Sequence, residues 1–208
     1  MKNTILCTNP LIETRLAIMR DKSSSVAAFR RALNECGALM SSTIVSDFPT
    51  QEKTIETPLE TTSARILARP VTVVAILRAA LGFVEGLTAY LPEARIGHLG
   101  FFRNEETLQP VSYYQKLPPG MAQDMVIIAD PMLATGGSMN LAIDVLKKSG
   151  CADNLVLASV IAAPEGIAAV RERHGDIPIY TAAIDRGLNE KGYILPGLGD
   201  AGDRQYGT

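Results

Sequence analysis

The sequence predicts an α/β fold, with a mostly parallel central sheet flanked by helices and a projecting antiparallel β-arm. Two continuous apolar runs, 71–77 (VTVVAIL) and 125–129 (MVIIA), have the β-branched character of strands that are buried on both faces of a parallel sheet. Helical patterns follow both runs and alternate with further apolar segments. Such alternation indicates parallel strands with helices on both faces of the sheet.

Helices are expected on either side of the first buried strand. Pro10–Arg20 and Ser24–Met40 carry apolar residues at spacings of three and four, so we expect two helices that cap the domain or contact another subunit. After the strand Val71–Leu77, the pattern predicts a helix over Leu81–Tyr90, which Pro92 closes.

The second half of the chain repeats the alternation. We expect a helix from about Ser138 to Lys148, ending at Gly150, and a helical stretch over Glu165–His174. The apolar segments Leu155–Ala163 and Ile177–Ala183 are the matching strands. A parallel sheet therefore continues toward the C-terminus.

Two regions differ from this pattern. Arg95–Phe101 and Val111–Leu117 flank a charged turn, which predicts an antiparallel arm over approximately 95–118. The tail, 193–208, is rich in Gly and too irregular to predict a helix or a strand. No repeat or linker divides the chain, so we expect one domain over 1–208.

Composition and charge limit the classes of partner. The net charge is −2 and 47% of the residues are hydrophobic, so neither nucleic acid nor an anionic membrane is an expected partner, and a small ligand is. Cys7, Cys36 and Cys151 lie far apart and are expected to be reduced packing residues. The sequence shows no signal-peptide core and no membrane span, so we expect a cytoplasmic location.

The segment 125–139 (MVIIADPMLATGGSM) predicts a phosphate site. A buried strand ends at the acid Asp130, and a loop of small residues then opens a helix, where backbone N–H groups and the helix dipole can hold one phosphate. The loop lacks the lysine of a nucleoside triphosphate loop, so an acid beside a phosphate cradle favours a sugar phosphate. A plain strand-to-helix connection is the alternative. The candidate site comprises Asp130, Pro131, Met132, Leu133, Ala134, Thr135, Gly136, Gly137 and Ser138.

A second strand end carries a cation. Arg78 follows the strand Val71–Leu77 and precedes a small-residue loop, where a guanidinium can bind pyrophosphate oxygens in a bidentate manner. Taken alone, Arg78 would more often be a surface salt-bridge residue, because Arg is mostly exposed and paired.

These segments together resemble one enzyme family. The segment 125–139 resembles the 5-phosphoribosyl 1-diphosphate (PRPP) motif of type I phosphoribosyltransferases, in particular the uracil phosphoribosyltransferases, although Pro131 replaces a second acid that is usual in the wider family. Around Arg78, ILRAALG is similar to the family's pyrophosphate loop, in which Ala80 is more often Gly. The arm resembles its flexible hood, and Arg103 matches a second pyrophosphate-binding arginine.

The tail carries the resemblance that concerns the base. YILPGLGDAGDRQYGT resembles the C-terminal signature of uracil phosphoribosyltransferases, which implies that the main chain of Ile194, Gly199 and Ala201 contacts uracil. The resemblance assigns Asp200 to both ligands, with a role in orienting them and in easing loss of the N1 proton. A frayed, Gly-rich terminus is the alternative.

The resemblance implies a reaction and its requirements. Uracil N1 would displace pyrophosphate from PRPP to give UMP, a step of pyrimidine salvage, through an oxocarbenium-like state that needs no protein nucleophile. Mg²⁺ would bridge pyrophosphate and ribose oxygens. Arg78, Arg103 and Asp200 are the expected catalytic residues, and no protein metal ligand is expected.

Other readings stay open. A phosphoribosyltransferase for orotate or a purine would share the PRPP loop, and a PRPP-sensing regulator would bind RNA instead. The resemblance also implies homodimers or homotetramers and a GTP effector, although no phosphate-binding signature outside the PRPP loop locates a GTP site. His98 and His174 receive no catalytic role, because His174 ends a helix, where a histidine is an ordinary partner of the helix dipole, and His98 has no acid fixed beside it in the sequence.

Overall fold

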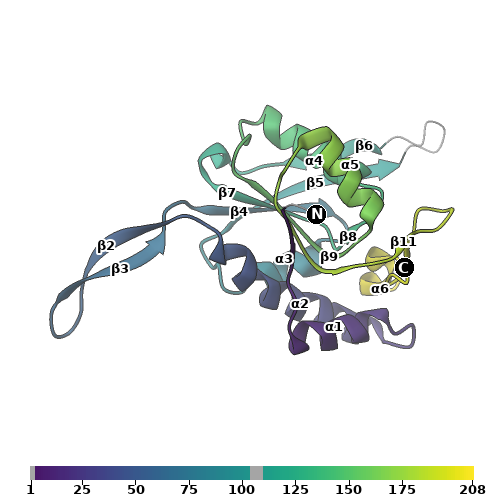
Figure 1. Cartoon of the computed structure of the whole chain (residues 1–208), viewed down its shortest axis with the longest axis horizontal. Coiled ribbons are helices and arrows are strands. Elements are labelled where there is room, and N and C mark those ends of the chain that lie inside the picture. The colour runs from purple at the N-terminus through teal and green to yellow at the C-terminus, as the bar shows by residue number, and fades with distance from the viewer. Residues whose placement is uncertain (1–2, 104–109) are drawn as a thin grey trace.

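A computed structural model of the chain describes residues 3–103 and 110–208 (Figure 1). Strands and helices alternate along most of the chain. In chain order they are β1 (Thr4–Leu6), α1 (Pro10–Arg20), α2 (Val26–Ser46), β2 (Thr50–Glu56), β3 (Thr61–Leu67), β4 (Val71–Leu77), α3 (Leu81–Leu87), β5 (Arg95–Arg103), β6 (Pro110–Lys116), a 3-10 turn (Met121–Gln123), β7 (Met125–Ala129), β8 (Met132–Leu133), α4 (Gly137–Lys148), β9 (Leu155–Ala162), α5 (Pro164–His174), β10 (Ile179–Ile184), β11 (Gly187–Leu188), β12 (Ile194–Leu195) and α6 (Ala201–Tyr206).

The main sheet has eight strands, in the order β1-β10-β9-β7-β4-β5-β6, with β8 also paired to β9. Every pairing in it is parallel except that of β5 with β6. All residues of β9, and all but the last of β4, are buried, which explains their continuous apolar sequences. The predicted mostly parallel sheet is confirmed.

Helices cover both faces of this sheet, as predicted (Figure 1). Successive strand residues point to opposite faces. Val73 therefore packs in one core, with Phe29 of α2 and Phe83 of α3, while Val74 packs in another with Ile143 of α4. The helices α1, α2 and α3 share the first face, and α4 and α5 share the second.

Two antiparallel hairpins differ from the expectation. The strands β5 and β6 pair antiparallel as predicted, but β5 also pairs with β4, so this arm is the edge of the main sheet. A separate hairpin, β2–β3, extends away from the sheet (Figure 1). The sequence analysis did not foresee it, because every residue of β2 is exposed and no apolar run marks the strand. The arm's turn, predicted over 103–107, lies outside the described residues from position 104 on.

Several element boundaries also differ from those predicted. Helix α2 continues to Ser46, six residues beyond the predicted Met40, and α3 ends at Leu87 rather than Tyr90. The tail was expected to be irregular, and that was wrong, since it holds β12 and α6. A helix of six residues is too short to show an apolar period, and it depends on the contacts described below.

The environment of the cysteines and the character of the helices agree with what the composition predicts. All three cysteines are free and buried, as predicted. Burial raises the pKa of the Cys7 thiol to about 11 and that of Cys36 to about 12, so both are neutral packing groups. None of the helices within 3–103 and 110–208 combines the length and the apolar character that a membrane crossing requires.

Candidate active site

The predicted phosphate loop lies at the carboxyl end of β7. The strand ends at Ala129, Asp130 follows, and the chain turns through Gly136 into α4, with Gly136 in the left-handed region at φ 80°. The loop surrounds a cavity of ≈ 90 Å³, lined by Asp130 and by residues 132–139. Pro131 does not line this cavity, and its carbonyl instead accepts hydrogen bonds from Val160 and Ile161 N–H, both at 3.0 Å.

Gly166 of α5 packs closely against the backbone of this loop. A Cβ on Gly166 would overlap the carbonyl oxygen of Ala134 and would lie 2.8 Å from that of Leu133. A Cβ on Gly136 would lie 3.1 Å from the Gly166 carbonyl. The loop backbone and α5 are therefore packed so closely that neither glycine leaves room for a side chain.

Asp130 is the carboxyl group of this loop. Burial raises its pKa to about 7, and the negative charge of Asp200 adds to the rise, whereas the Met132 N–H, at 3.2 Å from Oδ1, opposes it. Because its pKa lies near 7, the Asp130 carboxyl can ionise close to neutral pH. The ionised form can accept hydrogen bonds from hydroxyls. A bound cation would favour that ionised form.

Arg78 lies at the carboxyl end of the neighbouring strand, β4. Strands β4 and β7 are parallel, with Ala75 opposite Ala129, so the register brings Arg78 and Asp130 to the same edge of the sheet. The Arg78 side chain is 58% exposed, and its guanidinium lies 3.7 Å from Asp203 and 6.0 Å from the ring centre of Tyr206. The cation is thus available to a ligand.

The structure gives only the backbone of the second predicted arginine. Arg103 ends β5, which runs parallel to β4, and it pairs with Pro110. The side chain of Arg103 lies outside the described part of the chain, so its pyrophosphate role stays a prediction.

The tail lies beside both strand ends. The short strand β12 pairs with β11, and Gly197 and Gly199 both adopt the left-handed region, at φ 67° and 74°. Asp200 then caps α6 by accepting from Asp203 N–H at 3.0 Å. Ile194 and Ala201 are buried, whereas Gly199 and Asp200 are exposed.

A hydrogen bond attaches the tail to the predicted pyrophosphate loop, and Gly192, directly before the tail, lies close to the predicted phosphate loop. Gln205 of α6 donates to the carbonyl of Ala79, at 2.7 Å, in the loop that follows β4. A Cβ on Gly192 would lie 3.6 Å from Cγ2 of Thr135 in the phosphate loop. Arg78, the phosphate loop and the tail, predicted from three separate sequence segments, therefore gather at one edge of the sheet.

The sequence analysis missed the residues that hold the tail in place. Arg20 of α1 binds Asp185 through two hydrogen bonds, at 2.6 and 2.9 Å, and the pair contacts Gly197. Asp185 follows β10 as Asp130 follows β7, so an acid directly after an apolar strand was the available signal. Arg20 gave none, because it lies 165 residues from its partner.

The two histidines lie apart from these contacts. His174 ends α5, its Nε2 lies 3.2 Å from the carbonyl oxygen of Asn140, and burial lowers its pKa. It joins α5 to α4, as a structural role requires. His98 of β5 borders a cavity of ≈ 510 Å³ together with Glu85 and Tyr206.

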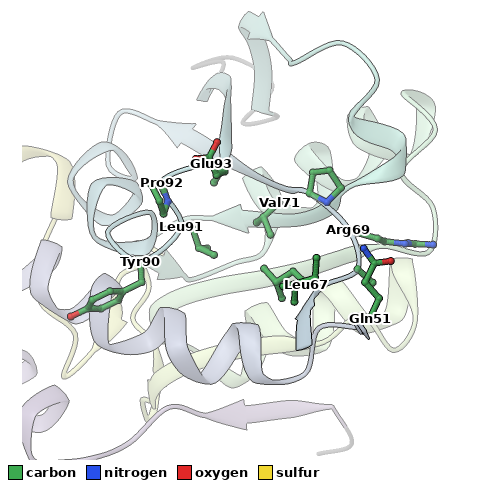
Figure 2. A pocket seen from close by; sticks show the side chains of 12 residues that line it. Gln51, Leu67, Arg69, Val71, Tyr90, Leu91, Pro92 and Glu93 are labelled. Carbon is green, nitrogen blue, oxygen red and sulfur yellow. The ribbon is translucent and has the colours of Figure 1, made fainter. Parts of the chain in front are cut away.

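A larger cavity, of ≈ 640 Å³, lies at the opposite end of β4 (Figure 2). Its walls come from the base of the β2–β3 hairpin and from the connection between α3 and β5, and Val71, the first residue of β4, forms part of them. Figure 2 shows Leu67 and Arg69 on one side and Leu91 on the other. Because Arg78 lies just past the last residue of β4, this cavity is separate from the candidate site.

Comparisons with known proteins agree with this geometry. The family model "Uracil phosphoribosyltransferase" matches residues 6–208. The chain is 51% identical over 201 residues to the uracil phosphoribosyltransferase of Levilactobacillus brevis, covering 96% of each chain. It is 48% identical over 209 residues to that of Clostridioides difficile, across the full length of both.

Solved structures show the same fold. The AQ2163 protein from Aquifex aeolicus superposes with a TM-score of 0.89 at 37% identity, covering 98% of this chain and 97% of that one. Adenine phosphoribosyltransferase from Trypanosoma brucei gives a TM-score of 0.57 at 13% identity, covering 92% of this chain and 88% of that one, which supports the fold alone. Because the family model covers residues 6–208 and relatives of about half-identical sequence match over nearly their full length, the chain belongs to the uracil phosphoribosyltransferase family.

Proposed function

We propose that this chain transfers the 5-phosphoribosyl group of PRPP to N1 of uracil, forming UMP and releasing pyrophosphate in pyrimidine salvage. The observation that carries the proposal is that the candidate phosphate loop, Arg78 and the tail lie at one edge of the sheet, where Gln205 of the tail donates to the Ala79 carbonyl after β4. A sugar phosphate in the loop would therefore lie beside a base held by the tail. The proposal treats residues 1–208 as one domain.

The phosphate loop would bind the ribose 5-phosphate. Its cavity offers the backbone of residues 134–138 and the hydroxyls of Thr135 and Ser138, at the start of a 12-residue helix. Asp130 would accept hydrogen bonds from the ribose hydroxyls. Met132 and Leu133 complete the walls of the cavity, whereas Pro131 would act through the backbone alone.

The arginines would stabilise the leaving group. As the bond from ribose C1 to pyrophosphate breaks, negative charge accumulates on the pyrophosphate and positive charge on the ribose. Arg78 has an exposed guanidinium at this edge, and we propose that Arg103 approaches it from the arm. A group that holds pyrophosphate in place and excludes water favours attack by uracil over hydrolysis.

The main chain of the tail would read the base. Uracil presents O2, N3–H and O4 in a row, and we propose that backbone groups of Ile194, Gly199 and Ala201 pair with them. Cytosine lacks the N3 hydrogen and carries an amine at C4, so it would leave buried polar groups unpaired. We assign Asp200 to orienting the two ligands and to easing loss of the N1 proton.

We propose that Mg²⁺ enters with PRPP. The pyrophosphate and ribose oxygens of PRPP would hold the ion, and the carboxylates of Asp130 and Asp200, whose charges interact, would lie beside it. The ion would neutralise charge on the leaving pyrophosphate. The protein's part is to hold the ribose and the base in line.

Location, assembly and regulation are further parts of the proposal. Free, buried cysteines suit a reducing cytoplasm. We propose a homodimer or homotetramer, supported by the hairpin's exposed apolar residues, Ile55, Leu59 and Ile66, the second of them 95% exposed. GTP as an allosteric effector rests on the family resemblance alone.

Product analysis tests the reaction. Purified protein, Mg²⁺ and PRPP are mixed in separate tubes with uracil, cytosine, orotate, hypoxanthine or guanine, and nucleotides are separated by chromatography. UMP in the uracil tube alone, with equal pyrophosphate release, is the expected result. Arg78→Gln should remove most of this activity, whereas Arg171→Gln, which breaks the ion pair between α5 and Asp176 and a hydrogen bond to Thr4, should not. No nucleotide in any tube, despite PRPP binding, would refute the enzyme and favour the RNA-binding regulator.

A further inference from the structure

The ion pair of half-buried Arg20 with buried Asp185 binds both backbone polar groups of Gly197. Asp185 accepts from the Gly197 N–H at 2.9 Å, and Arg20 donates to the Gly197 carbonyl at 2.8 Å. Arg20 and Asp185 bind each other through both nitrogens and both oxygens. The Asp185 side chain is only 5% exposed, so these are charge-assisted bonds in a largely water-free position.

Gly197 lies within the segment proposed to read the base. It follows Ile194 by three residues and precedes Gly199 by two. A Cβ on Gly197 would overlap the Ile194 carbonyl oxygen, so the turn is compact, and fixing Gly197 also fixes the backbone of Ile194. Residues 194–197 therefore have little freedom to move independently of one another.

A second arginine holds the next carbonyl. Arg204 of α6 donates to the carbonyl of Leu198 at 2.9 Å and also to that of Asp21 at 2.6 Å, directly after α1. Its guanidinium lies 4.5 Å from the ring centre of Phe29. The carbonyls of Gly197 and Leu198 are thus both turned toward the protein, away from any ligand.

We propose that Arg20 and Asp185 are positioning residues that set the affinity and the selectivity for uracil, an inference that rests on the proposed function. A base that is read by main-chain groups is recognised only if those groups stay within roughly 0.5 Å of their places. Neither residue is assigned a contact with the base. By holding Gly197, the pair fixes which backbone groups of residues 194–201 face the base.

The chain supplies a matched control on the same helix. Arg15 of α1 forms an ion pair with Glu35 of α2, and the Arg15 side chain is 27% exposed, against 26% for Arg20. The partner of Arg15 lies on α2, whereas Arg20 and its partner Asp185 both bind Gly197 of the tail. Removal of either guanidinium breaks one ion pair of α1, but only the loss of Arg20 frees the tail.

The experiment compares Arg20→Gln, Arg20→Lys and Asp185→Asn with Arg15→Gln in the UMP assay. Each KM is measured with the other substrate saturating, and thermal unfolding and circular dichroism report folding. We expect Arg20→Gln and Asp185→Asn to raise the KM for uracil by ~10-fold or more, the factor for one hydrogen bond to a charged group, with the KM for PRPP within about 2-fold of wild type. Uracil's preference over cytosine in kcat/KM should fall in parallel.

Arg20→Lys separates position from charge. A lysine keeps the charge but cannot bind both Asp185 and the Gly197 carbonyl with a rigid fork, so its uracil KM should lie between those of wild type and Arg20→Gln. If Arg20→Gln raises the uracil KM no more than Arg15→Gln does, or raises both KM values equally, the positioning role is refuted. A wild-type chain that forms no UMP would instead refute the proposed function, and this inference with it.

Discussion

Replacing Gly166 by alanine tests whether α5 holds the phosphate loop in place. The new Cβ would overlap the Ala134 carbonyl oxygen and lie 2.8 Å from that of Leu133, both backbone atoms that cannot move away as a flexible side chain could. Alanine is a better helix former by about 0.5–1 kcal/mol, whereas overpacking costs about 1–3 kcal/mol, so the clash should win. The net loss of unfolding free energy, ~1–2 kcal/mol, corresponds to a melting temperature lower by about 2–8 °C in a chain of this size.

The same clash should displace the loop that is proposed to bind PRPP. Because a misplacement of about 1 Å can cost on the order of 10²-fold, we expect the KM for PRPP to rise by ~10-fold or more while that for uracil changes by less than about 2-fold. Thermal unfolding and steady-state kinetics measure both effects. Ala168→Ser, at an exposed position of the same helix, is the control. An unchanged or higher melting temperature together with an unchanged PRPP KM would refute the reasoning.

Three further changes have distinct expected results. The pKa of Asp130 is raised on folding, so its protonation stabilises the ligand-free protein at low pH, and this contribution is lost as the pH rises through about 7. The melting temperature of Asp130→Asn relative to wild type should therefore rise as the pH rises from about 4 to about 7, and a constant difference would contradict the assignment. Arg95→Gln leaves the buried Asp124 without its ion pair, at the amino ends of the strands. The free energy of unfolding should fall by about 1–3 kcal/mol, while the KM values for uracil and PRPP stay unchanged. Altered KM values would argue against a separation of this ion pair from the candidate site. Removal of Mg²⁺ with EDTA should abolish UMP formation without lowering the melting temperature of the PRPP-free protein, and a lower melting temperature would indicate a structural metal.

The strands that the sequence predicted with their observed bounds are those covered on both faces of the sheet. Strand β4 and strand β7 were predicted with their observed bounds, because a strand covered on both faces is a continuous apolar run. The β2–β3 hairpin left no such run, since β2 is exposed throughout. Its stability depends on backbone pairing and on whatever surface covers it, neither of which an apolar period reports.

The site could be predicted only where its chemistry is local in sequence. The phosphate loop lies within one strand-turn-helix unit, so its residues and their spacing appear together. The support of the tail depends on Arg20, Asp185 and Arg204, which come from distant segments, and no spacing rule connects them. Helix α6 was missed for the same reason, because Arg30 and Ala79 hold it through Gln205.

The pairing of β1 with β10 has a consequence for the order in which this protein acquires its structure. Thr4 lies opposite Ile179, so β1 cannot pair with β10 until nearly the whole chain has been synthesised. Phe29 and Met40 of α2 can pack against α1 and α3, but their core also includes Tyr180 and Ala182 of β10, so it stays incomplete until β10 exists. On the ribosome, part of this apolar surface is thus exposed for most of synthesis, and contacts this distant in sequence fold slowly. Chaperone dependence should therefore be strongest for nascent chains that have not yet reached β10.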